Sequence, residues 1–233
     1  MNNIKKKTVE NQTPNYYTKI DKSLLIKTPN PNYHLHNLDI PFRGVIVAPS
    51  GSGKTNFLLD IIQKFCTGKG TFVDIIIITQ NKDEPLYNHL ESKGVIIKEG
   101  LHNTPVLDDY DKSVAHLLIF DDLVIAKEVK MIETYYLRCR KLNVSVIFLS
   151  QRYTPIPLMI RENTNYLFVL KMGNKRSIKL MMSEFSLSEP IEELMKLYEY
   201  ATKGKFNVLL IDKETSDNSK KYRKNFSEYL NTD

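Results

Sequence analysis

The amino-acid sequence predicts an α/β domain in which helices flank a central, mainly parallel sheet. Short apolar runs rich in Val, Ile and Leu occur at residues 45–47, 73–78, 117–120, 144–149 and 166–170. Runs of this kind are typical of strands buried on both faces of a parallel sheet. Between them, residues 57–65 and 129–139 carry apolar side chains at helical spacing, and strands that alternate with helices indicate a doubly wound fold.

The length and the distribution of polar residues predict one domain with an arm and a tail. A chain of 233 residues, 42% of them hydrophobic, fits a single buried core. We expect an extended N-terminal arm over residues 1–40, which are rich in Asn, Lys, Pro and Tyr, and a polar C-terminal tail over residues 214–233. The domain proper spans residues 41–213, where residues 191–200 add a helix and residues 206–211 a further strand.

The composition limits the kinds of partner and compartment. The net charge of +6 suits a polyanion such as nucleic acid, although a charge of this size is also ordinary for a soluble protein. Cys66 and Cys139 are the only cysteines, which excludes a disulfide framework and a four-cysteine zinc site and favours a reducing compartment. No apolar run approaches the roughly 18 residues of a membrane span, so we expect a soluble, intracellular protein without a membrane partner.

A glycine-rich turn joins the first apolar run to the helix that follows it. Residues 48–55 read APSGSGKT, with Ala48 in place of the glycine that usually opens a P-loop. Gly51 and Gly53 allow the backbone to curl, so that its N–H groups and the helix N-terminus hold phosphate oxygens. Lys54 is then expected to reach the β- and γ-phosphates of ATP, and the Thr55 hydroxyl to ligate Mg²⁺. The predicted nucleotide-binding residues are Pro49, Ser50, Gly51, Ser52, Gly53, Lys54, Thr55 and Asn56, and the competing interpretation is an ordinary Gly/Ser turn.

Two further strand ends carry polar side chains suited to phosphate chemistry. The run 117–120 ends in Asp121 and Asp122, and an α/β sheet places such acids beside its ligand crevice. Asp121 is expected to act on Mg²⁺, directly or through water, and Asp122 to orient or deprotonate the attacking water. Two acids after a strand are also typical of a solvated turn, and the short side chain of Asp122 leaves another base open. Gln151 follows the run 144–149 and is a candidate for sensing the γ-phosphate or holding the water, unless it only leaves a strand end.

Four stretches occur in an order that is known from one group of P-loop enzymes. They are GVIVAPSGSGKTNFLL, LLIFDDL, RCRKLNVSVIFLSQRYTPIPLMIREN and FNVLLID, spread over roughly residues 43–213. This arrangement resembles the FtsK/HerA superfamily of DNA-pumping ATPases, and more narrowly the genome-packaging ATPases of poxviruses, other large DNA viruses and virophages. The resemblance implies a RecA/FtsK-HerA-like P-loop NTPase with strand order 5-1-4-3-2. That order puts the Gln151 strand between the P-loop strand and the Asp121 strand.

The same resemblance implies an ATP-hydrolysing translocase that packages a viral double-stranded DNA genome into a capsid. It further implies a homo-oligomeric ring around the DNA, ATP at the subunit boundaries, a capsid or portal-vertex protein as a partner, and work in the host cytoplasm, a virus factory or the virion. Aligning the end of the Gln151 strand with that superfamily places Arg140 on its arginine finger, which stabilises transition-state charge in the neighbouring subunit. Arg161 is an alternative for that role. Arginines near a helix C-terminus, such as Arg138 and Arg140, also interact well with the helix dipole alone.

The remaining signals leave several interpretations open. Lys171, Lys175, Arg176 and Lys179 form a basic run without an acid, which suits a DNA channel and equally a solvated face. The segment 81–84 approaches the guanine-reading pattern of GTPases but ends in Glu where that pattern has Asp, so we expect no guanine specificity. Two other functions compete with translocation. One is a nucleotide or small-molecule kinase, which the two acids after residue 120 disfavour, and the other is an assembly factor that binds ATP and hydrolyses it weakly.

Overall fold

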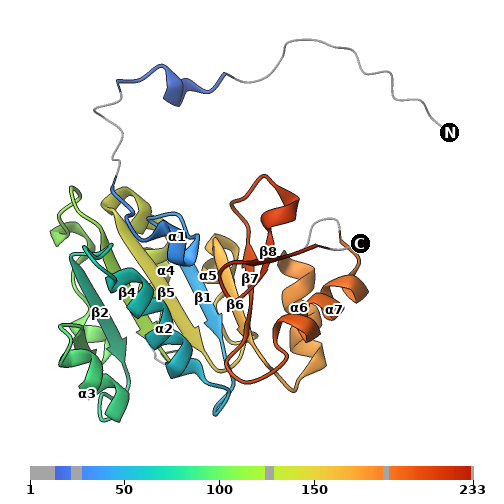
Figure 1. Cartoon of the computed structure of the whole chain (residues 1–233). Coiled ribbons are helices and arrows are strands. Elements are labelled where there is room, and N and C mark those ends of the chain that lie inside the picture. The colour runs from blue at the N-terminus through green and yellow to red at the C-terminus, as the bar shows by residue number, and fades with distance from the viewer. Residues whose placement is uncertain (1–13, 22–27, 124–128, 186–188, 232–233) are drawn as a thin grey trace.

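The computed structural model of the chain describes residues 14–21, 28–123, 129–185 and 189–231. Over these residues a nine-stranded sheet lies between two layers of helices (Figure 1). The strands are β1 (Arg43–Val47), β2 (Asp74–Thr79), β3 (Ile96–Glu99), β4 (His116–Asp121), β5 (Val144–Ser150), β6 (Tyr166–Leu170), β7 (Val208–Asp212), β8 (Tyr222–Lys224) and β9 (Glu228–Leu230). The helices are α1 (Tyr33–His36), α2 (Lys54–Cys66), α3 (Pro85–Glu91), α4 (Val129–Arg138), α5 (Leu158–Asn163), α6 (Lys175–Phe185) and α7 (Ile191–Ala201).

The strand order is β3-β2-β4-β5-β1-β6-β7-β8-β9. The neighbouring strands β3, β2, β4, β5, β1 and β6 are all parallel. Beyond β6, the strands β7, β8 and β9 continue the sheet, each antiparallel to the one before it. For the five predicted apolar runs, this is the expected order 5-1-4-3-2, with β5 between β1 and β4. The prediction of a mainly parallel sheet is therefore confirmed. The carboxyl ends of β1, β2, β4, β5 and β6 all lie along one side of the sheet, which is called its carboxyl edge below.

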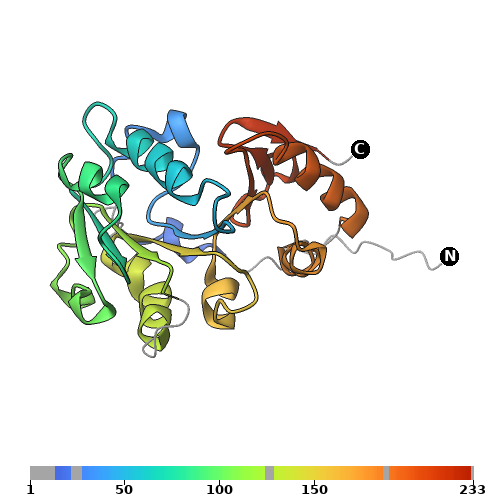
Figure 2. The same cartoon turned by 90° about the horizontal axis from the view of Figure 1, so that it is seen from below.

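Helices cover both faces of the sheet (Figure 2). Alternate side chains of a strand belong to the cores on opposite faces. In β1, Val45 and Val47 belong to the core that α4, α5, α6 and α7 cover, whereas Ile46 belongs to the core under α2 and α3. Every residue of β4 and β5 is buried, which is why these strands read as continuous apolar runs in the sequence. Within the described residues, no helix has the length and apolar character that a membrane crossing requires.

The structure contains elements that the apolar runs do not indicate. β3 is a four-residue strand at the edge of the sheet, with an exposure pattern too short to show a period. The basic run begins a helix, α6, whose opposite face buries Ile178, Met181 and Met182. The strand expected over residues 206–211 begins two residues later, because Phe206 has a left-handed backbone with φ of 65° that no regular strand contains.

The segment from Asn32 to Leu38 departs from the extended N-terminal arm that the sequence predicts. It contains α1, and the side chains of Asn32, His36 and Leu38 are buried. The Asn32 amide donates to the carbonyl oxygens of Phe65 at 2.9 Å and Thr67 at 2.8 Å, at the end of α2. Burial lowers the pKa of His36 to about 4, so its ring is neutral and Nδ1 accepts the Leu38 N–H at 3.0 Å. The polar composition is misleading here because the polar groups find partners inside the domain.

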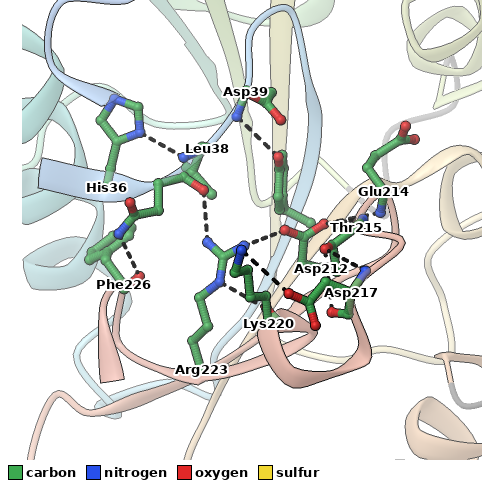
Figure 3. A network of polar contacts seen from close by, with 12 residues as sticks. His36, Leu38, Asp39, Asp212, Glu214, Thr215, Asp217, Lys220, Arg223 and Phe226 are labelled. Carbon is green, nitrogen blue, oxygen red and sulfur yellow. Dashed lines mark hydrogen bonds and ion pairs between the residues drawn. The ribbon is translucent and has the colours of Figure 1, made fainter. Parts of the chain in front are cut away.

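The C-terminal segment likewise differs from the loose polar tail expected from residue 214. Its strands β8 and β9 extend the sheet, and Arg223 forms an ion pair with Asp212 in which the two side chains are 4% and 6% exposed (Figure 3). Arg223 also donates to the carbonyl oxygen of Asn37 at 2.7 Å. Burial raises the pKa of the Asp212 carboxyl, and the charge of Arg223 opposes that rise. One guanidinium therefore connects β8 with β7 and with the end of α1.

Candidate nucleotide-binding site

The turn between β1 and α2 depends on two glycines. Gly51 and Gly53 have φ angles of 74° and 100°, in the left-handed region that glycine adopts without strain. A Cβ on Gly53 would lie 2.3 Å from the ring of Phe206, so a larger residue cannot be placed there without moving that ring. Gly53 also precedes α2, a helix of 13 residues whose unsatisfied N–H groups and dipole favour an anion at this end.

A pocket of about 430 Å³ lies against this turn. Seven of the eight predicted nucleotide-binding residues line it. The exception is Ser52, whose hydroxyl donates to the carbonyl oxygen of Pro49 at 2.6 Å. The lining residues are Pro49, Ser50, Gly51, Gly53, Lys54, Thr55, Asn56, Leu86, Gln151 and Phe206.

Lys54 and Asp121 meet at the edge of this pocket. The Lys54 ammonium lies 2.7 Å from Oδ1 of Asp121, and both side chains are largely withdrawn from solvent. The other oxygen of Asp121 accepts a hydrogen bond from the hydroxyl of Tyr87, a buried residue of α3. Burial, together with the charge of Asp121, raises the pKa of Tyr87, so this hydroxyl stays a donor. The carboxylate is thus held at a fixed position beside the P-loop lysine.

Asp122 and Gln151 contact each other across the ends of β4 and β5. Nε2 of Gln151 donates to Oδ2 of Asp122 at 2.6 Å. Asp122 has a left-handed backbone with φ of 56°, and its N–H donates to the carbonyl oxygen of Leu149 at 3.1 Å. A second pocket, of about 320 Å³, contains Asp122, Asp121 and Lys54. The structure therefore brings the predicted lysine, both acids and the glutamine to the carboxyl ends of the central strands, although they are spread from position 54 to position 151 in the sequence.

Glu84 is a member of this group that the sequence does not single out. It lines the second pocket, and its Oε1 accepts the Thr55 hydroxyl at 3.2 Å. In the sequence the segment 81–84 attracts attention only as an incomplete guanine-reading pattern. The position of Glu84 shortly after β2 could have indicated it as a site residue, because β2 is parallel to β4 and both strands end on the same side of the sheet. A third carboxylate, 3.2 Å from the predicted magnesium ligand, therefore belongs to the site.

The candidate arginine finger, Arg140, lies on the opposite side of the sheet, where the parallel strands begin. Arg140 is exposed in the 3₁₀ turn Cys139–Leu142, immediately before β5. The seven residues of β5 span about 23 Å, so Arg140 is remote from the P-loop of its own subunit. The two alternatives are engaged locally: Arg138 pairs with Asp108 at 2.5 Å, and Arg161 pairs with Glu184.

The predicted DNA contacts lie where β6 leads into α6. Lys171 follows β6, and Lys175, Arg176 and Lys179 lie in the first turns of α6. All four side chains are exposed, and none of them forms an ion pair with another residue that the structure describes. The helix dipole disfavours cations at a helix N-terminus. The local structure therefore gives no reason for this charge.

The fold has close counterparts among solved structures. The genome packaging NTPase B204 from Sulfolobus turreted icosahedral virus 2, in complex with sulfate, superimposes with a TM-score of 0.54 over 77% of this chain and 95% of that chain. The cytoplasmic domain of the type VII secretion ATPase EccC from Thermomonospora curvata gives the same TM-score over 81% of this chain and 25% of that chain. Both are 14% identical in sequence, so the likeness concerns the fold. The sheet order and the glycine-rich turn after β1 together define a P-loop NTPase fold.

The chain belongs to the family described as "Poxvirus A32 protein", whose profile matches residues 32–226. The DNA packaging protein OPG160 of variola virus is 33% identical over 146 residues, which cover 55% of this chain and 53% of that protein. The uncharacterized protein L649 of Acanthamoeba polyphaga mimivirus is 24% identical over 208 residues, covering 85% of this chain and 70% of that protein. The chain thus spans about half the length of the poxvirus proteins that it matches.

Proposed function

We propose that this chain is an ATPase that hydrolyses ATP to move double-stranded DNA during the packaging of a viral genome. The observation that carries the proposal is the meeting of Lys54, Asp121 and the hydrogen-bonded pair Asp122 and Gln151 at the P-loop pocket. Lys54 begins α2, directly after the turn that follows β1, and the other three side chains lie at the ends of β4 and β5; β1, β5 and β4 are neighbours in the sheet. A phosphate-binding turn beside acids and an amide is the arrangement that phosphoryl transfer to water requires.

The residues at the pocket fit a magnesium nucleotide. Mg²⁺ prefers oxygen ligands and usually takes only one or two from the protein, the rest coming from water and phosphate. Thr55 and Asp121 supply such oxygens, and Asp121 is held in place by Tyr87. When bound, Mg²⁺ supplies positive charge that neutralises the phosphates. Lys54 pairs with Asp121, and we propose that its ammonium also contacts the phosphates of the nucleotide.

Hydrolysis also needs a group that orients and deprotonates water. We assign this role to Asp122, because its carboxylate lies in the same pocket as Asp121 and Lys54 and is held by Gln151. Gln151 lines the P-loop pocket as well, so it is the side chain through which the presence of a γ-phosphate can be relayed to Asp122. Glu84 lines the same pocket and is the alternative carboxylate for this role.

DNA as the partner rests on the family and on charge. The variola relative is named as a DNA packaging protein, and this chain carries a net charge of +6. The unpaired basic residues of α6 follow β6, at the edge where the P-loop lies. Backbone phosphates are the contact that a sequence-tolerant translocase needs. We place Lys171, Lys175, Arg176 and Lys179 on the DNA side of a homo-oligomeric ring that works with a capsid or portal-vertex protein at the site of virion assembly.

The experiment that tests the proposed function is phosphate release from MgATP by the full chain, with and without double-stranded DNA. Stimulation by DNA of any sequence, absent in Lys54→Ala, is the expected result. Transfer of phosphate to a small acceptor in place of water would instead support a kinase. ATP binding with no phosphate release under either condition would support the assembly factor and contradict the proposal.

A further inference from the structure

Phe206 is a half-exposed aromatic residue at the rim of the P-loop pocket. It lies in the connection between α7 and β7, and 51% of it is accessible to solvent. Its φ of 65° is unusual for a residue with a bulky side chain. Its ring lies against Gly53, where an added Cβ would meet it at 2.3 Å. The connection therefore holds an apolar ring over the P-loop instead of burying it in the core.

Phe206 also lines a third pocket, of about 460 Å³, together with residues of α2 and the turn after β8. Asn56 and Phe206 are common to this pocket and to the P-loop pocket, so the two spaces adjoin at these side chains. The rings of Phe57 and Phe226 form part of its wall, stacked with centroids 5.6 Å apart and planes inclined by 12°. This pocket thus places aromatic side chains, together with polar ones, next to a phosphate-binding turn.

The two spaces that flank the P-loop pocket differ in chemistry. One is lined by Lys54, Asp121 and Asp122, the side chains suited to the phosphates. The other is lined by Asn56, the last predicted phosphate-binding residue, by the rings of Phe57, Phe206 and Phe226, and by the ion pair of Asp60 with Lys64. A triphosphate anchored by the P-loop with its terminal phosphate toward the acids has its nucleoside end toward Asn56 and Phe206.

We propose that Phe206 is the stacking platform for the base of the bound nucleotide and that the pocket beyond it receives that base. This assignment rests on the proposed nucleotide-binding function and names the residue that recognises the nucleoside. Base–aromatic stacking is sequence-tolerant and contributes substantially to affinity for each base that stacks. The accessible face of Phe206 is available to such a base.

The test compares MgATP with magnesium tripolyphosphate, which has the phosphates and lacks the nucleoside, by titration calorimetry on the full chain. Phe206→Asn removes the ring with a residue that tolerates positive φ, and Phe206→Tyr keeps the ring as the matched control. The expected result is that Phe206→Asn binds MgATP about 10- to 100-fold more weakly and tripolyphosphate as the wild type does. Phe206→Tyr should bind both ligands at wild-type affinity.

Three outcomes would overturn the assignment, and they differ from one another. Wild-type MgATP affinity in Phe206→Asn would show that the base does not stack there. An equal loss of affinity for both ligands would show that Phe206 only supports the turn at Gly53. A wild-type chain that binds neither ligand would overturn the proposed function itself, and this assignment with it.

Discussion

The two acids of the site, Asp121 and Asp122, differ in their contacts and in their exposure to solvent. Asp121 has both oxygens engaged, one by Lys54 and one by Tyr87, and it is buried. Asp122 is more accessible, and its left-handed backbone turns it toward Gln151. A fixed acid suits a metal ligand, whereas an accessible acid held by an amide suits a base that must approach water.

Asp122→Asn is therefore expected to bind MgATP as the wild type does and to lose hydrolysis by about 10²- to 10⁴-fold, the usual contribution of a general base. Single-turnover phosphate release, together with nucleotide titration, measures both quantities. Asp111→Asn is the matched control, because Asp111 lies in an exposed turn in which its carboxylate accepts hydrogen bonds from Ser113. A wild-type rate in Asp122→Asn, combined with a large loss in Glu84→Gln, would move the role of base to Glu84.

At the scale of elements, the sequence predicts those strands whose environment is uniform. β4 and β5 are buried on both faces, so their apolar runs identify them and place Asp121 and Gln151 correctly at the strand ends. β8 and β9 were not predicted, because three-residue strands that contain a buried Arg223 and an exposed Tyr229 show no pattern. Glu84 was missed for a related reason, since its link to Thr55 exists only once β2 is parallel to β4.

The antiparallel extension of the sheet depends on Arg223, which leads to a stability prediction. Arg223→Ala leaves Asp212 as an unpaired buried acid, and breaking such a pair costs about 3–5 kcal/mol. Urea unfolding monitored by circular dichroism gives this value. Lys224→Ala, which removes a partly exposed cation from the next position, is the matched control and should cost less than about 1 kcal/mol. Equal midpoints for the two variants would show that the Asp212 pair does not hold β8 in the fold.

At the scale of the whole molecule, the P-loop follows the carboxyl end of β1, whereas Arg140 precedes the amino end of the parallel neighbour β5. The two therefore lie at opposite ends of the strands. In this fold a subunit does not bring its own Arg140 to its own P-loop. Arg138 and Arg161 pair with acids of the same chain, whereas Arg140 is in none of the ion pairs formed among the described residues. We propose a ring in which Arg140 of one subunit reaches the nucleotide of the next.

Mixing two inactive variants tests this arrangement. Arg140→Ala is expected to reduce hydrolysis by about 10³-fold or more, as the loss of an arginine finger does. Lys54→Ala disables the P-loop. In a mixed ring some boundaries combine an intact P-loop with an intact Arg140 of the neighbour, so phosphate release should partly return. If native mass spectrometry shows mixed rings and the activity stays absent, Arg140 does not act between subunits.

The central claim, that hydrolysis at this edge moves the protein along DNA, is tested most directly by displacement of a triplex-forming oligonucleotide from double-stranded DNA. Wild-type protein with MgATP is predicted to release the oligonucleotide. The rate of release should fall as the salt concentration rises, because salt weakens ionic contacts with the backbone phosphates. Lys54→Ala should bind the same DNA and release none. Wild-type protein that hydrolyses ATP on this DNA and leaves the triplex in place would contradict the account.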